Sequence, residues 1–236
     1  MRTANTVAAA LSLTGALAGA LVPAAAAQDP PGFVGSVTFA NEYVLRGVSQ
    51  SDEEPVVQGN IDFVAGGFYI GAWGSVIEIT ELAGSDSPAE LDVYLGYVWE
   101  WASGWSFELG AIHYDYPRDE FLDYEEGYVA VGYKVFKLKY YYSDDFLGLD
   151  AAGHYLDGTL EIPLGASGFT LTLHGGLNSF DFDVEPPIIE DYIDYKGGLS
   201  YTWNNFTLDV SYTDTDENQF GDLDDGRVIG SVILSL

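Results

Sequence analysis

The sequence predicts an all-β protein: a transmembrane, antiparallel, up-and-down β-barrel of 12 strands, with short periplasmic turns and longer extracellular loops. Twelve stretches of alternating apolar and polar residues fill the chain between Val34 and Leu236. The gaps between these stretches alternate in length, short and then long. An even number of strands of roughly 9–11 residues, with tight turns at one end and loops at the other, is typical of outer-membrane barrels. A soluble β-protein has no reason to sort its loops in this way.

The gaps place the predicted strands in order. The first strand spans Val34–Val48, and the last strand ends at Leu236. Because an open sheet edge in lipid leaves backbone groups unpaired, we expect the first strand to pair with the last. The short gaps are residues 65–67, 102–104, 135–136, 165–168 and 203–205, and the long gaps are residues 47–55, 80–89, 115–123, 143–152, 180–191 and 214–226.

The N-terminus has the composition of a secretory signal peptide. Arg2 precedes an apolar run that reaches Val22, and small residues at positions 25–27 follow Pro23. This pattern predicts a signal peptide over residues 1–27, cleaved after Ala27, a periplasmic lead-in over 28–33 and a barrel over 34–236. No later run approaches the 20 or so apolar residues of a transmembrane helix. The chain has no cysteine, which excludes disulfides and thiolate metal sites.

Each strand separates into an apolar and a polar face, because successive side chains point to opposite sides. In the stretch 89–101, Leu91, Val93 and Leu95 alternate with Glu90 and Asp92. A soluble sandwich would show the same alternation, with the apolar face inside. Residues 68–77 are apolar on both faces, so the sequence leaves the orientation of that strand open, along with the placement of Trp73 and Glu78.

The positions of the aromatic residues favour a membrane over a sandwich. Aromatic rings prefer the bilayer–water interface, and a ring of them is expected beside the short periplasmic turns. The predicted girdle at that rim consists of Trp99, Trp101, Trp105, Tyr201, Trp203 and Phe206. A second girdle toward the long loops would contain Tyr43, Tyr140, Tyr142, Tyr195 and Tyr212.

If the apolar face meets lipid, the polar face lines the lumen. A charge facing lipid at mid-depth costs about 2–4 kcal/mol, so charged strand residues are expected inside. Six of the seven cations that remain after cleavage, including Lys137, belong to the inward face. The predicted pore-lining residues are Glu42, Arg46, Asp62, Asp92, Glu108, Glu126, Lys134, Lys139, Asp157, Glu161, His174, Asp194, Lys196, Asp209 and Arg227.

Charge narrows the function classes. The formal net charge of −29 excludes nucleic-acid binding as a main activity. The long loops are acidic, and such a vestibule enriches cations. We therefore expect passive, cation-preferring diffusion of ions or small polar solutes through a narrow lumen. The expected partners are these solutes, the barrel-insertion machinery and outer-membrane lipids, including lipopolysaccharide, whose phosphates divalent ions could bridge to the loops. The oligomeric state is left open.

Two other classes of function compete with a channel. In a non-conducting barrel, the same charges would pair into a network that fills the interior. An outer-membrane lipid-modifying enzyme would need a nucleophile beside a histidine, and no local pattern pairs a serine with His113, His154 or His174. The sequence thus predicts no catalytic residue and no cofactor. It predicts no metal site either, because the segment 214–218 resembles the start of a calcium loop without its glycine or final glutamate.

The N-terminal part of the predicted barrel resembles a known family. The residues that carry the resemblance are 37–55, 58–62, 67–75 and 90–97, which include the runs Asn41-Glu42-Tyr43 and Arg46-Gly47-Val48. They are similar to the opening blocks of the TorF family of porins. The resemblance implies a bacterial outer-membrane barrel with pore activity, and it brings neither a substrate nor catalytic residues.

Overall fold

The computed structural model describes residues 31–78, 87–184 and 187–236. The predicted signal peptide and residues 28–30 of the lead-in lie outside the described residues. Within these residues, no helix is long and apolar enough to span a membrane.

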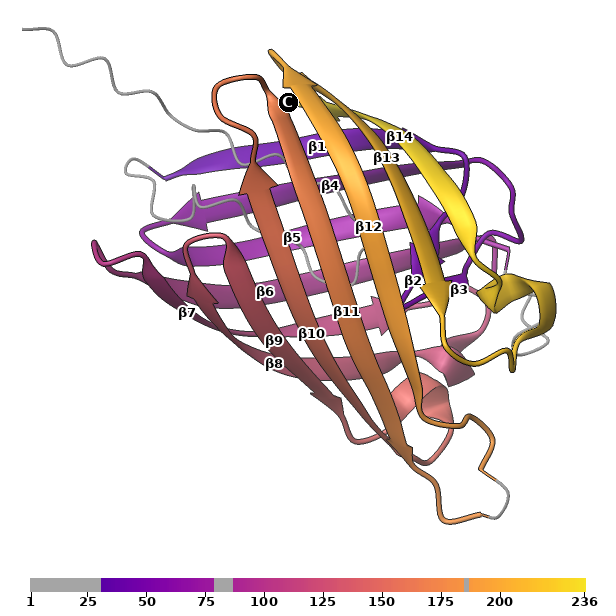
Figure 1. The fold of residues 1–236 in the computed structure, drawn as a ribbon. Helices are drawn as coiled ribbons and strands as arrows, with labels where there is room; N and C mark the ends of the chain where they lie inside the picture. The colour runs from indigo at the N-terminus through magenta and orange to yellow at the C-terminus, as the bar shows by residue number, and fades with distance from the viewer. Residues whose placement is uncertain (1–30, 79–86, 185–186) are drawn as a thin grey trace, which may run out of the picture.

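Twelve antiparallel strands form one closed barrel (Figure 1), which confirms the predicted fold class. Each strand except those at the closure pairs with its neighbours in the chain. The barrel strands are β1 (Gly32–Ala40), β4 (Val56–Ala65), β5 (Phe68–Val76), β6 (Ala89–Glu100), β7 (Trp105–Asp115), β8 (Tyr124–Tyr133), β9 (Phe136–Ser143), β10 (Ala152–Pro163), β11 (Phe169–Asp181), β12 (Tyr192–Trp203), β13 (Phe206–Thr215) and β14 (Arg227–Ser235).

The barrel closes between the first strand and the last, as predicted. Strand β1 pairs with β14 from Ser36 opposite Ser235 to Ala40 opposite Ser231. On its other side, β1 pairs with β4 along its whole length. The wall begins at Gly32, two residues before the predicted barrel boundary.

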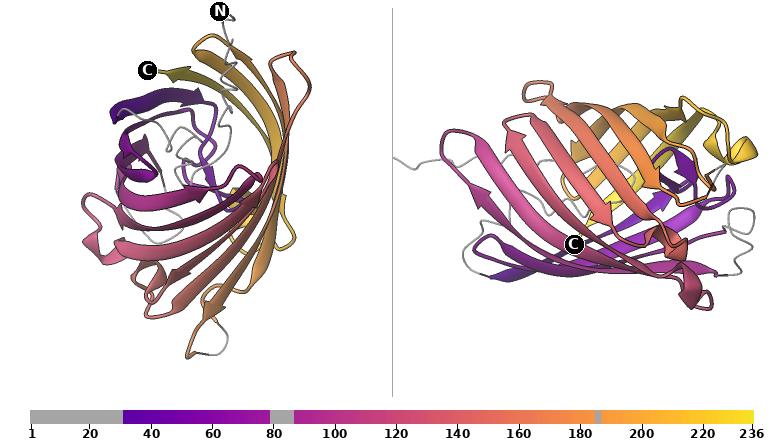
Figure 2. Two further views of the ribbon diagram at one scale, coloured as in Figure 1. Left: turned by 90° about the vertical axis from the view of Figure 1, so that its left-hand side faces the viewer. Right: turned by 90° about the horizontal axis from the view of Figure 1, so that it is seen from below.

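The connections alternate between short and long, as the sequence indicates. The β4–β5 turn is Gly66-Gly67, and both glycines have positive φ, as a two-residue hairpin turn requires. The long connections at the other end contain the 3₁₀ turns η2 (Glu120–Leu122), η3 (Phe146–Gly148) and η4 (Gly221–Asp224). Figure 2 shows the wall from two further directions.

The first strand is shorter than predicted, so the expectation of a strand over Val34–Val48 is wrong. At Asn41 the backbone N–H still donates to the Gly230 carbonyl (3.1 Å), while the Asn41 side chain accepts from the Gly230 N–H (2.6 Å). The chain then leaves the wall and forms a small hairpin from β2 (Val44–Leu45) and β3 (Val48–Ser49). Arg46 and Gly47 turn it with φ of 49° and 84°, the geometry of a type I′ turn.

The two faces of the wall differ in chemistry. Outward positions carry exposed apolar side chains in mid-strand, among them Ile61, Ile70, Val93, Leu95, Leu109, Val129, Leu173, Leu199, Leu208 and Val210. Inward positions are mostly polar or tyrosine. In β5, whose orientation the sequence left open, Tyr69 and Trp73 are buried inside and Phe68 and Ile70 are exposed outside. Glu78 is exposed beyond the end of that strand.

Candidate pore lining

The hairpin β2–β3 lies inside the barrel. Arg46, at its tip, donates two hydrogen bonds from Nη2 to the carboxylate of Glu126 on β8, at 2.7 and 2.8 Å. Its guanidinium also lies 4.3 Å from the ring centroid of Tyr155 on β10. A Cβ on Gly47 would come within 2.9 Å of the Cβ of Asp194 on β12. The tip therefore reaches from one side of the barrel to the other.

Further contacts hold the residues before the hairpin against the barrel wall. The Tyr43 hydroxyl donates to Glu90 (3.2 Å), and its ring packs edge-on against Trp73 at 5.3 Å between centroids. Burial and the negative charge of Glu90 raise the pKa of the Tyr43 phenol, so this group stays a neutral donor. Arg227 on β14 forms an ion pair with Glu42. We call residues 41–55 the inner segment.

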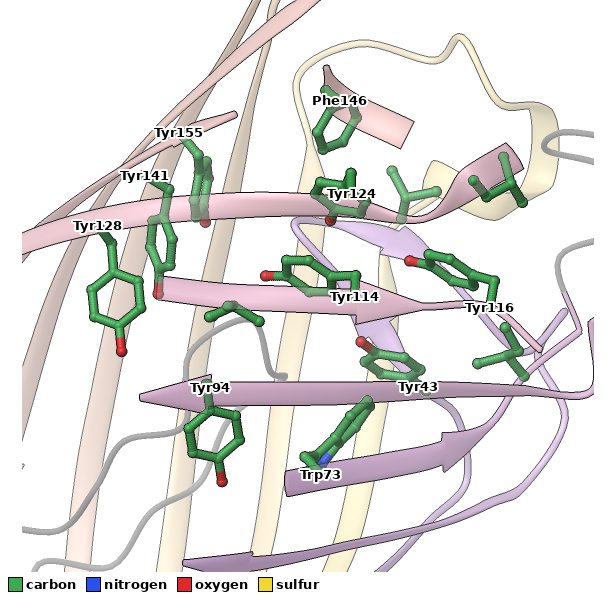
Figure 3. Packing of buried hydrophobic residues seen from close by; sticks show 14 of the residues in the cluster. Tyr43, Trp73, Tyr94, Tyr114, Tyr116, Tyr124, Tyr128, Tyr141, Phe146 and Tyr155 are labelled. Atoms are coloured by element: carbon green, nitrogen blue, oxygen red, sulfur yellow. The ribbon is translucent and has the colours of Figure 1, made fainter. Parts of the chain in front are cut away.

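Buried tyrosines lie beside the inner segment (Figure 3). They come from strands β5 to β10, from the loop after β7 and from the inner segment. Tyr114 stacks on Tyr124 at 4.3 Å with nearly parallel rings. This tyrosine cluster consists of Tyr43, Tyr69, Tyr94, Tyr114, Tyr116, Tyr124, Tyr128, Tyr141 and Tyr155, each 4% exposed or less. Sequence reasoning missed it. Alternation placed Tyr94 on the inward face, and the same parity marks Tyr114, Tyr124 and Tyr128, but we expected aromatics mainly at the membrane interfaces.

A charged network lies next to the tyrosine cluster. Glu108 on β7 accepts from Lys137 Nζ at 2.5 Å and from the Tyr69 hydroxyl at 2.7 Å. Lys139 Nζ is 3.9 Å from the same carboxylate and 3.6 Å from the Tyr128 ring centroid. A cation between a carboxylate and a ring face is stabilised by both.

His174 on β11 joins a second network. Its Nε2 lies 2.8 Å from Asp194 Oδ1, and its Nδ1 lies 3.2 Å from the Thr159 hydroxyl and 3.5 Å from Asp157. None of these contacts involves a serine.

The structure places fourteen of the fifteen predicted pore-lining residues toward the interior, and it places one elsewhere. Glu42 and Arg46 lie toward the interior, but they belong to the inner segment rather than to the wall. Those on wall strands that lie toward the interior are Asp62, Asp92, Glu108, Glu126, Lys139, Asp157, Glu161, His174, Asp194, Lys196, Asp209 and Arg227. Lys134 is the exception. It is exposed in the β8–β9 turn with φ of 54°, because the turn is Lys134-Val135 and not the predicted Val135-Phe136.

The aromatic residues predicted for the periplasmic rim lie on the outer surface beside short turns. Trp99, Trp101, Trp105, Trp203 and Phe206 are 41–62% exposed, and Tyr201 is half-buried against Phe169. In the second predicted girdle, Tyr140, Tyr142, Tyr195 and Tyr212 are also exposed on the outside. The placement of Tyr43 there is wrong, because that residue belongs to the inner segment and is 1% exposed.

One group of residues on the loop side has the composition of a metal site, although the sequence predicts none. Single ligand atoms of His113, Asp115 and Asp123 lie within 4.8 Å of one another. The His113 side chain faces outward and contacts Glu125 at 2.9 Å, and Asp123 accepts from the Tyr116 N–H at 2.8 Å. His113 is exposed and the two aspartates are half-buried, and surface groups of this composition are common without a bound ion.

Solved structures share this architecture. The KdgM porin is 16% identical with a TM-score of 0.59, and the match covers 85% of this chain and 99% of that one. A KdgM porin in complex with disordered oligogalacturonate gives 15% identity and a TM-score of 0.57 over 85% and 99% of the two chains. The NanC porin is 12% identical with a TM-score of 0.54, and the match covers 86% of this chain and 98% of that one. At these identities the likeness concerns the fold.

Sequence comparison gives the family. No curated protein matches the chain. The resemblance to the TorF family is supported as far as a porin-like barrel, and the family name is not confirmed. A family model described as "Bacterial protein of unknown function (Gcw_chp)" matches residues 24–225. The chain therefore belongs to the Gcw_chp family.

Proposed function

We propose that this protein is an outer-membrane porin that gives passive, cation-preferring diffusion of ions or small polar solutes through a narrow lumen. The observation that carries the proposal is the sorting of side chains by the closed wall, with apolar residues outside and charged residues inside. A barrel whose whole outer belt is apolar fits lipid. The TorF resemblance and the likeness to KdgM and NanC support the same class.

The charge of the interior supports the preference for cations. Carboxylates point inward from Asp62, Glu90, Asp92, Glu108, Glu126, Asp157, Glu161, Asp194 and Asp209, joined by Glu42 of the inner segment. They outnumber the inward cations Arg46, Lys137, Lys139, Lys196 and Arg227. A lumen with this excess lowers the energy of cations more than that of anions. A polyanion such as the oligogalacturonate seen with KdgM is therefore a poor solute for this barrel.

The remaining features of the proposal concern export and partners. We infer that residues 1–27 form a cleaved signal peptide, that the insertion machinery places the barrel in the outer membrane, and that its acidic loops face outward toward lipopolysaccharide. The exposed aromatics beside the short turns would then lie at the periplasmic interface.

A second function is favoured by one specific observation. The inner segment and the tyrosine cluster occupy the barrel on the side of the long loops. Buried ion pairs such as Arg46–Glu126 and aromatic packing could close the lumen entirely, which would give a non-conducting structural barrel. A lipid-modifying enzyme receives no such support, because the described contacts of the three histidines run to carboxylates and to tyrosine or threonine hydroxyls.

Planar bilayers test the proposal directly. We expect refolded protein to give discrete conductance steps and a reversal potential of cation-selective sign across a salt gradient. Glu161→Gln, at a half-buried inward position, should reduce that potential, whereas Glu125→Gln, on the outer face of the wall, should leave it unchanged. Silent bilayers with a folded barrel would exclude the channel and favour the non-conducting barrel. Conductance with anion preference would overturn the charge argument alone.

A further inference from the structure

The guanidinium group of Arg46 lies against one carboxylate and three aromatic rings. Both carboxylate oxygens of Glu126 on β8 accept from Arg46 Nη2, at 2.7 and 2.8 Å. The ring centroids of Tyr155, Tyr141 and Phe146 (Figure 3) lie 4.3, 5.4 and 5.9 Å from the guanidinium carbon. Carboxylates and aromatic faces both attract a guanidinium. Strands β8–β10 and the loop after β9 therefore supply the carboxylate and the rings, and the inner segment supplies the cation.

This site is deeply buried and rich in negative charge. The side chains of Arg46 and Glu126 are 5% and 1% exposed. Glu90 and Asp92 on β6 are buried as well, and each has one carboxylate oxygen without a hydrogen-bond partner among the described residues. Asp92 lies opposite Tyr114, whose hydroxyl donates to Glu126 at 3.0 Å. If Arg46 left, buried carboxylates would remain without their cation, which is strongly unfavourable unless another cation takes its place.

The polar attachment of the hairpin tip depends on that one side chain. Strands β2 and β3 share two pairs of residues. In the part of the chain that the structure describes, Arg46 makes the polar contacts between residues 44–48 and the wall. Its Nε is buried without a hydrogen-bond partner among those residues, and an unsatisfied buried donor is costly. A free guanidinium, which no backbone holds, can orient its donors without this constraint.

We propose that this site binds a small organic cation with a guanidinium head, which displaces the Arg46 side chain and with it the tip of the inner segment. The ligand and Arg46 compete for one carboxylate. The apparent affinity is therefore the intrinsic affinity multiplied by the fraction of molecules in which Arg46 has left the site. Binding goes beyond passive diffusion and does not depend on it. Only an effect of the ligand on conduction rests on the proposed porin function.

Calorimetry on the full folded chain in detergent micelles tests the site. The probe is n-propylguanidinium, which reproduces the arginine side chain from Cβ outward, and n-propylurea is a neutral molecule of similar shape. We expect saturable one-site binding of n-propylguanidinium to the wild type, at least about tenfold tighter than that of n-propylurea, because hydrogen bonds between charged groups are stronger than neutral ones.

Three variants locate the binding. Arg46→Ala removes the competing side chain and should bind n-propylguanidinium at least about tenfold more tightly than the wild type does. Adding Glu126→Gln to that variant should make the affinities for the two ligands similar. The matched control is Lys137→Ala, which also removes an inward cation paired with a carboxylate, that of Glu108 (2.5 Å). Lys139 remains 3.9 Å from that carboxylate, so the control should keep the wild-type affinity.

Heat-modifiable migration on gels establishes that each variant folds. If Arg46→Ala does not fold alone, n-propylguanidinium and not n-propylurea should restore folding, and failure to do so would overturn the proposal. It would also be overturned by the absence of saturable binding to the wild type, by equal affinities of Arg46→Ala and the wild type, or by an added Glu126→Gln without effect. Saturable binding to a barrel that is silent in bilayers would support the site and exclude the porin, whereas conduction without binding would do the reverse.

Discussion

At the scale of single residues, the inward tyrosines depend on glycines in neighbouring strands. Tyr128 on β8 lies opposite Gly110 on β7, and Tyr69 on β5 lies opposite Gly96 on β6. A Cβ on Gly110 would overlap the Tyr128 hydroxyl and come within 2.6 Å of the Leu95 carbonyl oxygen. The absence of a side chain lets each ring lie flat against the wall, so these glycines are packing positions rather than turn positions.

This packing predicts different costs for two alanine substitutions. Gly110→Ala should lower the free energy of unfolding by about 1–3 kcal/mol, because the overlapping backbone oxygen leaves no room to adjust. Gly127→Ala is the matched control, since Gly127 lies outward on β8 and an added Cβ there would have no atom within 4 Å. We expect it to leave stability unchanged or raise it by up to about 1 kcal/mol. Urea unfolding in lipid vesicles measures both, and equal losses would contradict the packing argument.

At the scale of elements, sequence periodicity predicted the wall well, because an apolar outer face and a polar inner face impose a period of two on every strand. It did not predict the inner segment. Residues 42–49 carry apolar and polar side chains that are compatible with a continued strand, and only the Arg46-Gly47 pair signalled a turn. The same reasoning failed for Lys134, where a shift of one residue in the turn moved the side chain out of the lumen. Periodicity also left the orientation of β5 undecided, because the inward face of that strand carries Tyr69 and Trp73 and is therefore as apolar as its outward face.

Gly47, in the turn of the β2–β3 hairpin, is the position at which a substitution should displace the inner segment. Gly47 has φ of 84°, and a side chain there would overlap the Thr215 methyl group and the Asp194 Cβ. We expect Gly47→Leu to displace the hairpin from the lumen and to raise the single-channel conductance, or to turn a silent barrel into a conducting one. Backbone strain alone should cost about 1–3 kcal/mol.

A matched control separates strain from displacement. Gly66→Leu introduces the same residue at φ of 56° in the β4–β5 turn, where no atom lies within 4 Å of the added Cβ. It should lose stability without changing the conductance. If the two variants conduct alike, the inner segment does not restrict the lumen.

At the scale of the whole molecule, the barrel is organised with its polar and aromatic core inside and its apolar surface outside. The cost of a charge on that surface should therefore depend on depth in the bilayer. Leu95, in the middle of β6, and Val76, at the last residue of β5, are both 48% exposed. In water, lysine at these two positions would have similar effects on stability, because the exposed fractions are equal.

In lipid the two variants should differ. Leu95→Lys is expected to lower the free energy of unfolding by about 2–4 kcal/mol, and Val76→Lys, near the interface on the side of the long loops, by about 0–1 kcal/mol. Denaturant titrations in vesicles measure the difference, and heat-modifiable migration on gels establishes that each variant folds. Equal costs at the two sites, or wild-type protein that stays soluble without detergent and shows no shift on heating, would mean that the apolar belt does not face lipid. A difference of the expected size would fix the bilayer midplane near Leu95, and the inner segment would then lie on the outer side of it.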